Sequence, residues 1–155
     1  MSVQTGDQAP DFELPSSAGG KVRLSSFRGE RHVALVFYPF TFTGVCHGEL
    51  CEIRDDLRSF EDAAVQVLAV SCDSVHSQRK WAGEEGFGFP VLSDFWPHGA
   101  VAKAYGVFND ALGCANRQTF VIDKAGTVVA TFSSADLRTP RQRAEYRAAL
   151  DKLVA

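Results

Sequence analysis

The sequence has no long hydrophobic run and little excess charge of either sign. No apolar stretch among its 155 residues approaches the roughly 18 residues that a membrane-spanning helix requires. Its 16 basic and 19 acidic residues give a formal net charge of −3, without the clustered basic residues of a nucleic-acid-binding surface. These features argue against a membrane protein and against nucleic acid as a partner. Residues 1–12 lack the basic and apolar regions of a secretory signal, so we expect a cytoplasmic protein.

Cysteine is also scarce, and the four cysteines include no pair at Cys-x-x-Cys spacing. His47 and His76 do not stand at ligand spacing from them, so the sequence predicts no metal site, and we expect no cofactor. Structural disulfides are rare in the reducing cytosol. Catalysis, or burial as small apolar side chains, therefore remains open as the role of these cysteines.

The order of predicted elements indicates an α/β protein. Because repeats, low-complexity tracts and long linkers are absent, residues 1–155 are expected to form one domain. The strand–helix–strand unit in this order predicts two parallel strands, and the whole order predicts a three-layer α/β/α sandwich on a mixed sheet. The predicted elements are a β-hairpin (12–14 and 21–24), a buried strand (32–38), a helix, a second buried strand (65–70), a helix after Asp73 or Ser74, a helical turn (100–104), an antiparallel hairpin (118–123 and 127–132) and a final helix.

Capping residues predict where two of the helices begin. Thr43 is the expected N-cap of the first helix, and apolar residues at spacings of three and four predict that this helix continues unbroken for about 16 residues. Thr139 is the expected N-cap of the final helix. Pro140 would then take the first helical position, and Gln142 would complete a capping box.

The segment after the first buried strand holds the candidate site. The carboxyl ends of parallel strands are where α/β sheets place their active sites. If Thr43 caps the helix, Cys46 lies in its first turn, where unpaired backbone N–H groups and the helix dipole favour a thiolate. The Thr43 hydroxyl, three residues earlier, can point toward the sulfur. On these features alone, a nucleophilic Cys46 and a passive buried cysteine are equally open.

Pro39, Thr43 and Cys46 form the pattern Pro-x-x-x-Thr-x-x-Cys. This pattern resembles the active-site signature of the peroxiredoxins, thiol peroxidases with a thioredoxin-like fold and an N-terminal β-hairpin. The segment 93–101 and the short C-terminus are most similar to the alkyl hydroperoxide reductase E subfamily. The resemblance covers nearly the whole chain, because further similar segments lie at 6–12, 70–81, 89–94, 104–107 and 116–123.

The resemblance implies a role for each matching residue. Cys46 is expected to be the peroxidatic cysteine, which attacks hydrogen peroxide, organic hydroperoxides or peroxynitrite and becomes a sulfenic acid. Thr43 is expected to position the peroxide, and Pro39, which lacks an N–H, to shield the sulfur from water. Arg117 would stabilise the thiolate and the departing oxygen. Glu49, one turn after Cys46, would hold Arg117 in place.

Cys51 is the candidate resolving cysteine. Its spacing from Cys46 occurs in peroxiredoxins of the bacterioferritin-comigratory type and is a departure from the subfamily E pattern. Residues five apart on an ideal helix have Cα atoms about 8.7 Å apart, whereas a disulfide needs less than roughly 7 Å. A Cys46–Cys51 bond therefore requires the start of the helix to unwind, and a one-cysteine cycle is the alternative. Cys72 is expected to be structural, and Cys114 to be a passive loop cysteine with a backup resolving role left open.

The resemblance also implies partners and competing functions. A homodimer is expected, with a thiol reductant: thioredoxin would suit a resolving Cys51, and mycothiol or mycoredoxin would suit a one-cysteine cycle. The alternative is a non-catalytic thioredoxin-like redox sensor or chaperone module, which would not need the signature residues together. A Cys–His hydrolase is disfavoured, because His47 directly follows Cys46 and points about 100° away on a helix.

Overall fold

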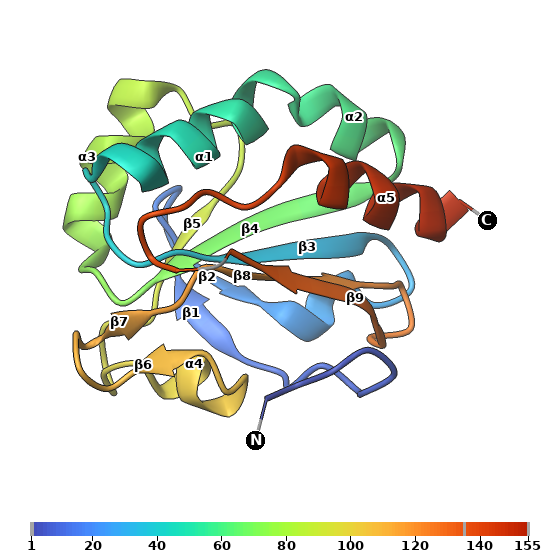
Figure 1. Ribbon diagram of the computed structural model, residues 1–155, viewed down its shortest axis with the longest axis horizontal. Coiled ribbons are helices and arrows are strands. Elements are labelled where there is room, and N and C mark those ends of the chain that lie inside the picture. The colour runs from blue at the N-terminus through green and yellow to red at the C-terminus, as the bar shows by residue number, and fades with distance from the viewer. Residues whose placement is uncertain (1, 135, 155) are drawn as a thin grey trace.

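The computed structural model describes residues 2–134 and 136–154 and contains a mixed central sheet of five strands (Figure 1). The strands lie in the order β5-β4-β3-β8-β9, in which β3, β4 and β5 are parallel and β8 and β9 are antiparallel to their neighbours. The predicted mixed sheet is therefore confirmed. The bounds are β3 (His32–Phe37), β4 (Val65–Ser71), β5 (Val91–Ser93), β8 (Gln118–Ile122) and β9 (Val128–Ser133).

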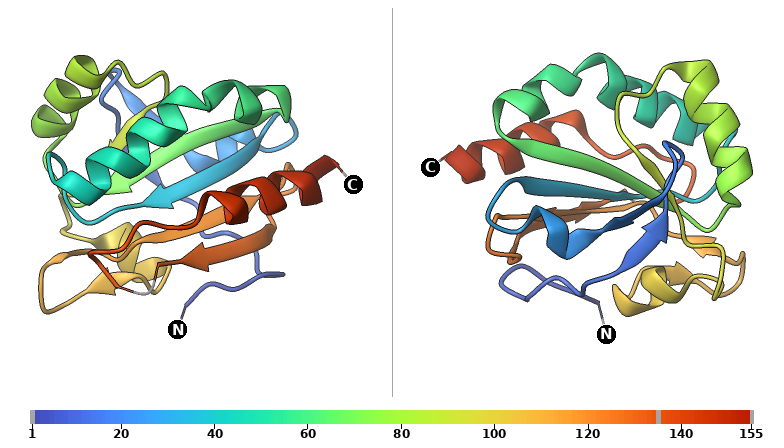
Figure 2. Two further views of the ribbon diagram at one scale, coloured as in Figure 1. Left: turned by 45° about the horizontal axis from the view of Figure 1, so that its top comes forward. Right: turned by 180° about the vertical axis from the view of Figure 1, so that it is seen from behind.

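Helices cover one face of the sheet (Figures 1 and 2). Alternating side chains of the strands, such as Ala34 and Val36, pack there against Leu50, Ile53 and Trp81 from the helices. β3 is the central strand of the sheet and is buried on both faces, which explains its nearly continuous apolar sequence. These helices are α1 (Gly44–Asp55), α2 (Leu57–Asp62), α3 (Val75–Glu85) and α5 (Arg143–Val154).

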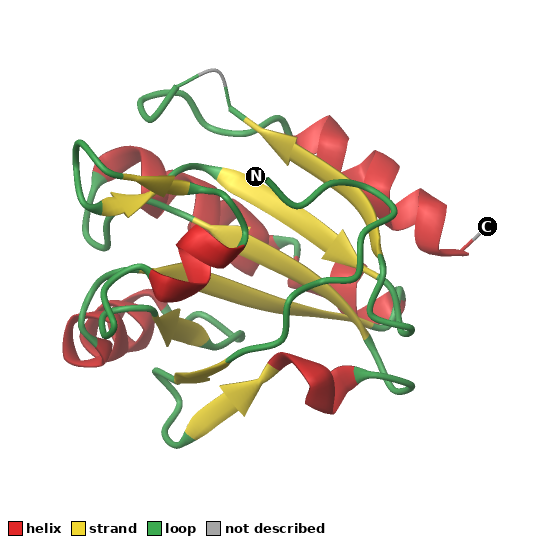
Figure 3. Ribbon diagram, turned by 90° about the horizontal axis from the view of Figure 1, so that it is seen from below, coloured by secondary structure: helices red, strands yellow, loops and turns green. Residues whose placement is uncertain are grey.

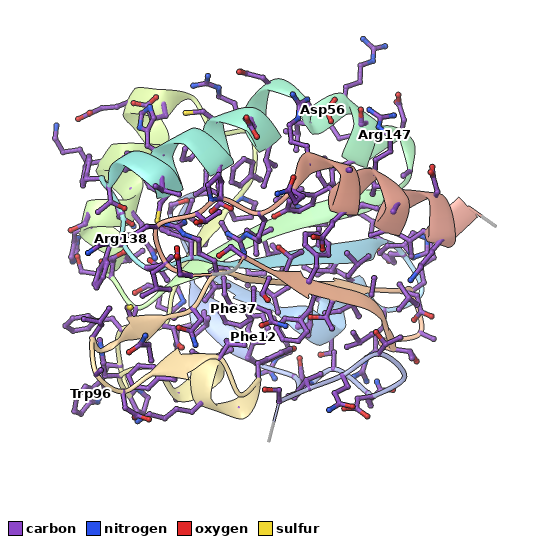
Figure 4. The ribbon with its side chains drawn as sticks, in the orientation of Figure 1. Phe12, Phe37, Asp56, Trp96, Arg138 and Arg147 are labelled. Carbon is purple, nitrogen blue, oxygen red and sulfur yellow. The ribbon has the colours of Figure 1, made fainter. Side chains whose placement is uncertain are left out.

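Shorter elements cover the opposite face, which Figure 3 shows from below. Phe37 points to this side and contacts Tyr105 and Phe120, with ring centroids 5.4 Å and 5.9 Å apart. Phe12 packs in the same cluster below the sheet (Figure 4). The three-layer α/β/α prediction is thus confirmed. These elements are β1 (Glu13–Pro15), β2 (Lys21–Arg23), the 3-10 helix η1 (Leu24–Phe27), α4 (Ala100–Ala104), β6 (Phe108–Asn109) and β7 (Cys114–Ala115).

The helix predicted to continue unbroken after Thr43 is divided in two, so that prediction was wrong. Asp56 separates α1 from α2, with φ −108° and ψ 17°. The Ser59 hydroxyl donates a hydrogen bond to the Asp56 carboxylate at 2.7 Å. Aspartate favours helix ends over helix interiors, because its side chain can compete for backbone hydrogen bonds.

The final helix begins later than its capping residues predict. Since α5 begins at Arg143, the predicted N-cap at Thr139 and capping box over 139–142 were wrong. The Thr139 hydroxyl instead donates to the Asp136 carboxylate at 3.0 Å. Arg141 is drawn into the protein interior, where its backbone N–H and its side chain both bind the carboxylate of α1 described below. These contacts hold the segment 139–142 out of a helix.

The α3 helix is capped as predicted and ends two residues beyond Gly83. The Ser74 hydroxyl accepts a hydrogen bond from the backbone N–H of Ser77 at 3.2 Å. Gly86 closes the helix in the left-handed conformation, with φ 65°. Glu85 is therefore the last residue of α3. Within the described residues, no helix is long and apolar enough to cross a membrane.

Candidate active site

Cys46 lies in the first turn of α1, immediately after the loop that leaves β3. Thr43 is the N-cap in an extended conformation, as predicted. The first helical hydrogen bond runs from the His47 N–H to the Thr43 carbonyl at 2.8 Å, so the Cys46 N–H precedes it in the turn. The Cys46 side chain is 0% exposed and packs among apolar side chains of β3 and the helices. Its sulfur thus lies at the positive end of a helix in an apolar environment.

The loop before Cys46 is held by its own hydrogen bonds. The Thr43 hydroxyl donates to the Phe40 carbonyl at 2.7 Å, which leaves its oxygen lone pairs as acceptors. Phe42 has a φ of 69°, a left-handed conformation that is uncommon for an aromatic residue, and its side chain is 53% exposed. Pro39, two residues after the end of β3, is buried. Such a left-handed backbone conformation persists only where surrounding contacts fix it.

A buried ion network joins α1 to the C-terminal half of the chain. The Arg117 Nη1 donates to Glu49 Oε1 at 2.7 Å, and Arg117 Nε donates to the Leu137 carbonyl at 2.8 Å. The contact expected between Glu49 and Arg117 is therefore present. Arg141 also donates to both Glu49 oxygens, through its backbone N–H at 2.7 Å and through Nε and Nη2 at 3.0 Å and 2.9 Å. Glu49 fixes both arginines.

Arg141 is the residue of this network that the sequence did not reveal. Its side chain is buried and also donates to the Phe37 carbonyl at 2.7 Å, at the end of β3. In the polar segment around it, Arg-Thr-Pro-Arg-Gln-Arg, nothing distinguishes a buried arginine from its exposed neighbours. Arg141 differs from its neighbours because it contacts the Glu49 carboxylate of α1, and this contact depends on the tertiary fold.

The network controls the ionisation of Glu49. Burial alone would raise the pKa of Glu49, but the hydrogen bonds and charge of Arg141, with the charge of Arg117, outweigh burial and hold this pKa below its ordinary value of 4.5. When the pKa of a carboxylate is lower in the folded protein than in the unfolded chain, ionisation of that carboxylate stabilises the fold. This stabilisation is fully present above the pKa of the unfolded chain and is lost as the pH falls through the pKa of the folded protein.

We therefore predict an acid-dependent effect of Glu49→Gln. The free energy of unfolding lost in this variant should be greatest above about pH 5 and should shrink in acid, because the wild-type carboxylate is then protonated too. Urea unfolding of both proteins between about pH 3 and pH 7 measures this difference. A difference that stays constant or grows toward low pH would contradict the prediction.

The other three cysteines have environments that favour the protonated thiol. Burial raises the pKa of Cys72 to about 12, and burial also raises the pKa of Cys114. Cys114, expected in a loop, lies in the short strand β7. The pKa of Cys51 is raised by burial and by the neighbouring Glu85 carboxylate, although the charge of Arg54 opposes this. All four cysteines are free thiols in the structure.

Comparisons with known proteins agree with this geometry. The chain belongs to the AhpC/TSA family, which matches residues 5–131. It is therefore a peroxiredoxin, a thiol-dependent peroxidase with a thioredoxin-like fold, as the sequence predicts.

Individual relatives support this assignment over nearly the full length. Alkyl hydroperoxide reductase E of Mycobacterium tuberculosis is 44% identical over 153 residues, which are 99% of this chain and 97% of the relative. The crystal structure of peroxidoxin BcpB from the same organism superimposes with a TM-score of 0.85 at 35% identity, covering 98% of this chain and 97% of that one. The reduced 2-Cys peroxiredoxin of Plasmodium vivax gives a TM-score of 0.86 at 28% identity, covering 96% of this chain and 81% of that one.

Proposed function

We propose that Cys46 is the peroxidatic cysteine. The observation that carries this proposal is that Cys46 is buried in the first turn of α1. The chain also belongs to a family of thiol peroxidases. The Cys46 thiolate attacks one oxygen of a hydroperoxide, so an S–O bond forms while the O–O bond breaks. The electron pair of the O–O bond leaves with the other oxygen as alkoxide or hydroxide, which takes up a proton to give the alcohol or water. Cys46 is left as a sulfenic acid.

The neighbouring residues have separate roles in this step. Arg117 uses two N–H donors on Glu49 and Leu137, and its remaining donors and its charge stabilise the thiolate and the departing oxygen. Because Thr43 donates to Phe40, its lone pairs can accept the O–H of the hydroperoxide and so orient it. Pro39, without an N–H, limits water at the sulfur.

We further propose that Cys51 resolves the sulfenic acid. Its thiol proton and the Cys46 hydroxyl leave as water when the disulfide forms. Both cysteines lie in the continuous helix α1, five residues apart, so the first turns of α1 must unwind for the sulfur atoms to meet. The reduced protein is then fully folded, and the disulfide form is locally unfolded.

Intact mass after one equivalent of hydrogen peroxide tests both proposals. We expect the wild type to lose two hydrogens, and Cys51→Ser to gain one oxygen as a sulfenic acid. A 1,3-diketone should convert this sulfenic acid, with loss of water, to a thioether on the peptide containing Cys46. Cys114→Ser, which removes the other candidate resolving thiol, should behave as the wild type. A stable gain of one oxygen in the wild type would overturn resolution by Cys51. Trapping on any other cysteine would overturn the role of Cys46.

We propose that hydrogen peroxide, organic hydroperoxides and peroxynitrite are substrates, and that a cytoplasmic thiol system is the reductant. The exposed rings of Phe40 and Phe42 beside the site favour organic hydroperoxides. A resolving Cys51 favours thioredoxin over mycothiol or mycoredoxin. Turnover measured for each oxidant with each reductant should be fastest with an organic hydroperoxide and thioredoxin. Turnover with mycothiol or mycoredoxin alone would contradict the proposed reductant and, with it, a two-cysteine cycle.

We also propose a homodimer. Three large apolar side chains, Phe95, Trp96 and Leu112, are exposed. Of these, Trp96 is 81% exposed and lies at one end of the molecule (Figure 4). His98 links their loops, because its Nε2 lies 2.8 Å from the Gly113 carbonyl and its Nδ1 lies 3.1 Å from the Phe95 carbonyl. Sedimentation should give a dimer for the wild type and a monomer for Trp96→Glu. A monomeric wild type would contradict the proposal.

A further inference from the structure

Three potential metal ligands of different chemistry meet where α1 and the end of α3 come together. His47 and Cys51 are four residues apart on α1 and therefore share one face of the helix. Glu85, the last residue of α3, reaches the same point from the neighbouring helix. The ligand atoms of these three side chains all lie within 4.8 Å of one another. The sequence predicts no role as a metal ligand for His47, but a spacing of four residues on a helix brings His47 and Cys51 together, and their meeting with Glu85 depends on how the helices pack.

Two distances within this cluster are close to those between the ligands of a tetrahedral metal. The His47 Nε2 lies 3.5 Å from Glu85 Oε2, and the Cys51 Sγ lies 3.7 Å from the same oxygen. Zinc bonds of about 2.0 Å to nitrogen and oxygen and about 2.3 Å to sulfur place tetrahedral ligand atoms roughly 3.3–3.5 Å apart. The third distance, between the ligand atoms of His47 and Cys51, is at most 4.8 Å, so these two side chains must approach each other for all three protein bonds to form.

The site is accessible and supported by its surroundings. The side chains of His47 and Glu85 are 43% and 24% exposed, which leaves a fourth position open to water. Arg54 donates to the Glu85 carbonyl at 2.8 Å and so ties the end of α3 to α1. The Arg54 side chain also lies 3.6 Å from Glu85 Oε2, a contact that counts against a cation, but its charge is shared with Asp55, whose carboxylate is 2.9 Å away.

The charges of the cluster also suit a divalent cation. Neutral His47, a Cys51 thiolate and the Glu85 carboxylate together balance two positive charges. A nitrogen, a sulfur and an oxygen ligand form a set that zinc accepts, whereas calcium and magnesium require oxygen ligands. In the metal-free protein, the Cys51 thiol instead donates a weak hydrogen bond to Glu85.

We propose that His47, Cys51 and Glu85 form a binding site for Zn²⁺ in the reduced protein. The metal forms a bond to the Cys51 sulfur and displaces the thiol proton to solvent, with no change of oxidation state. This proposal does not rest on peroxidase activity or on a resolving role for Cys51, because the binding is measured without peroxide. While the metal is bound, the Cys51 sulfur is occupied and is not available to Cys46.

Cobalt(II) is a suitable probe, because thiolate ligation gives it a charge-transfer absorption in the near ultraviolet. The reduced full-length protein, kept anaerobic with a thiol-free reductant, should bind one equivalent of Co²⁺ with this band, and Zn²⁺ should displace it. Cys51→Ala should abolish the band, whereas Cys46→Ala should retain it. No saturable binding, or an unchanged band in Cys51→Ala, would overturn the proposal.

Matched variants separate ligation from general effects on surface charge. His47→Gln and Glu85→Gln should each weaken Zn²⁺ binding by at least about tenfold, since loss even of an outer-sphere partner costs that much. The controls are His76→Gln on the exposed side of α3 and Glu84→Gln, which neighbours Glu85 and pairs with Lys80 at 2.9 Å. Both controls should bind as the wild type. Equal losses in the controls and in the ligand variants would show that the metal binds elsewhere.

Discussion

Replacing Cys46 by alanine should lower the second-order rate constant for hydroperoxide reduction by at least about a thousandfold, the scale on which loss of a nucleophile acts. None of the other thiols can take over the reaction. Burial holds the pKa of Cys51, Cys72 and Cys114 above its ordinary value, so each is a thiol rather than a thiolate at neutral pH. Consumption of hydroperoxide under saturating reductant measures the rate.

Cys72→Ala is the matched control for this substitution. Cys72 is also buried, so the control loses the same side-chain atoms from the protein interior and reports on packing. We expect it to keep the wild-type rate within about twofold, with a modest loss of stability. A Cys46→Ala protein that retains the wild-type rate would show that another residue is the nucleophile.

Arg141→Met should destabilise the fold by about 3–5 kcal/mol, the usual cost of removing one partner of a buried ion pair. The variant removes the three side-chain donors that reach Glu49 and the Phe37 carbonyl and leaves the Glu49 carboxylate with Arg117 as its remaining side-chain partner. Methionine keeps the unbranched stem of arginine as far as Nε and lacks the guanidinium group, so the loss measures mainly charge and hydrogen bonding. Urea unfolding at neutral pH gives the free energy.

Arg138→Met tests whether this cost belongs to the buried network. Arg138 lies three residues earlier in the same segment, and its side chain is exposed (Figure 4). Substitution at such a surface position should change stability by less than about 0.5 kcal/mol. Equal losses in Arg138→Met and Arg141→Met would contradict the assigned role of Arg141 in the network.

Much of the fold follows from local sequence patterns. The apolar alternation and runs of the strands, the Ser74 cap and the strand–helix–strand order all predict structure that is present, because each depends on neighbours in the chain. The position of Cys46 in the first turn of α1 was likewise predictable from Thr43. The peroxiredoxin resemblance then supplied the pairing of Glu49 with Arg117, which lie 68 residues apart.

The features that the sequence did not reveal depend on distant contacts. A favourable capping pattern at Thr139 is overridden because Glu49, 92 residues before Arg141, binds both the Arg141 backbone and its side chain. The break at Asp56 was missed because apolar spacing continues across it. The cluster of His47 and Cys51 with Glu85 required the packing of α3 against α1.

The Arg141 backbone N–H, near the C-terminus, donates a hydrogen bond to Glu49 of α1. Deuterium exchange of this amide therefore reports whether α1 is folded around Glu49. Glu49 lies between Cys46 and Cys51, so unwinding of this part of the helix withdraws the carboxylate from the amide. Segments coupled in this way open together, and their amide hydrogens exchange with solvent at a common rate. The Arg141 amide should therefore be protected from deuterium exchange in the reduced protein and exposed in the disulfide form, which would make a distant segment part of the same opening unit.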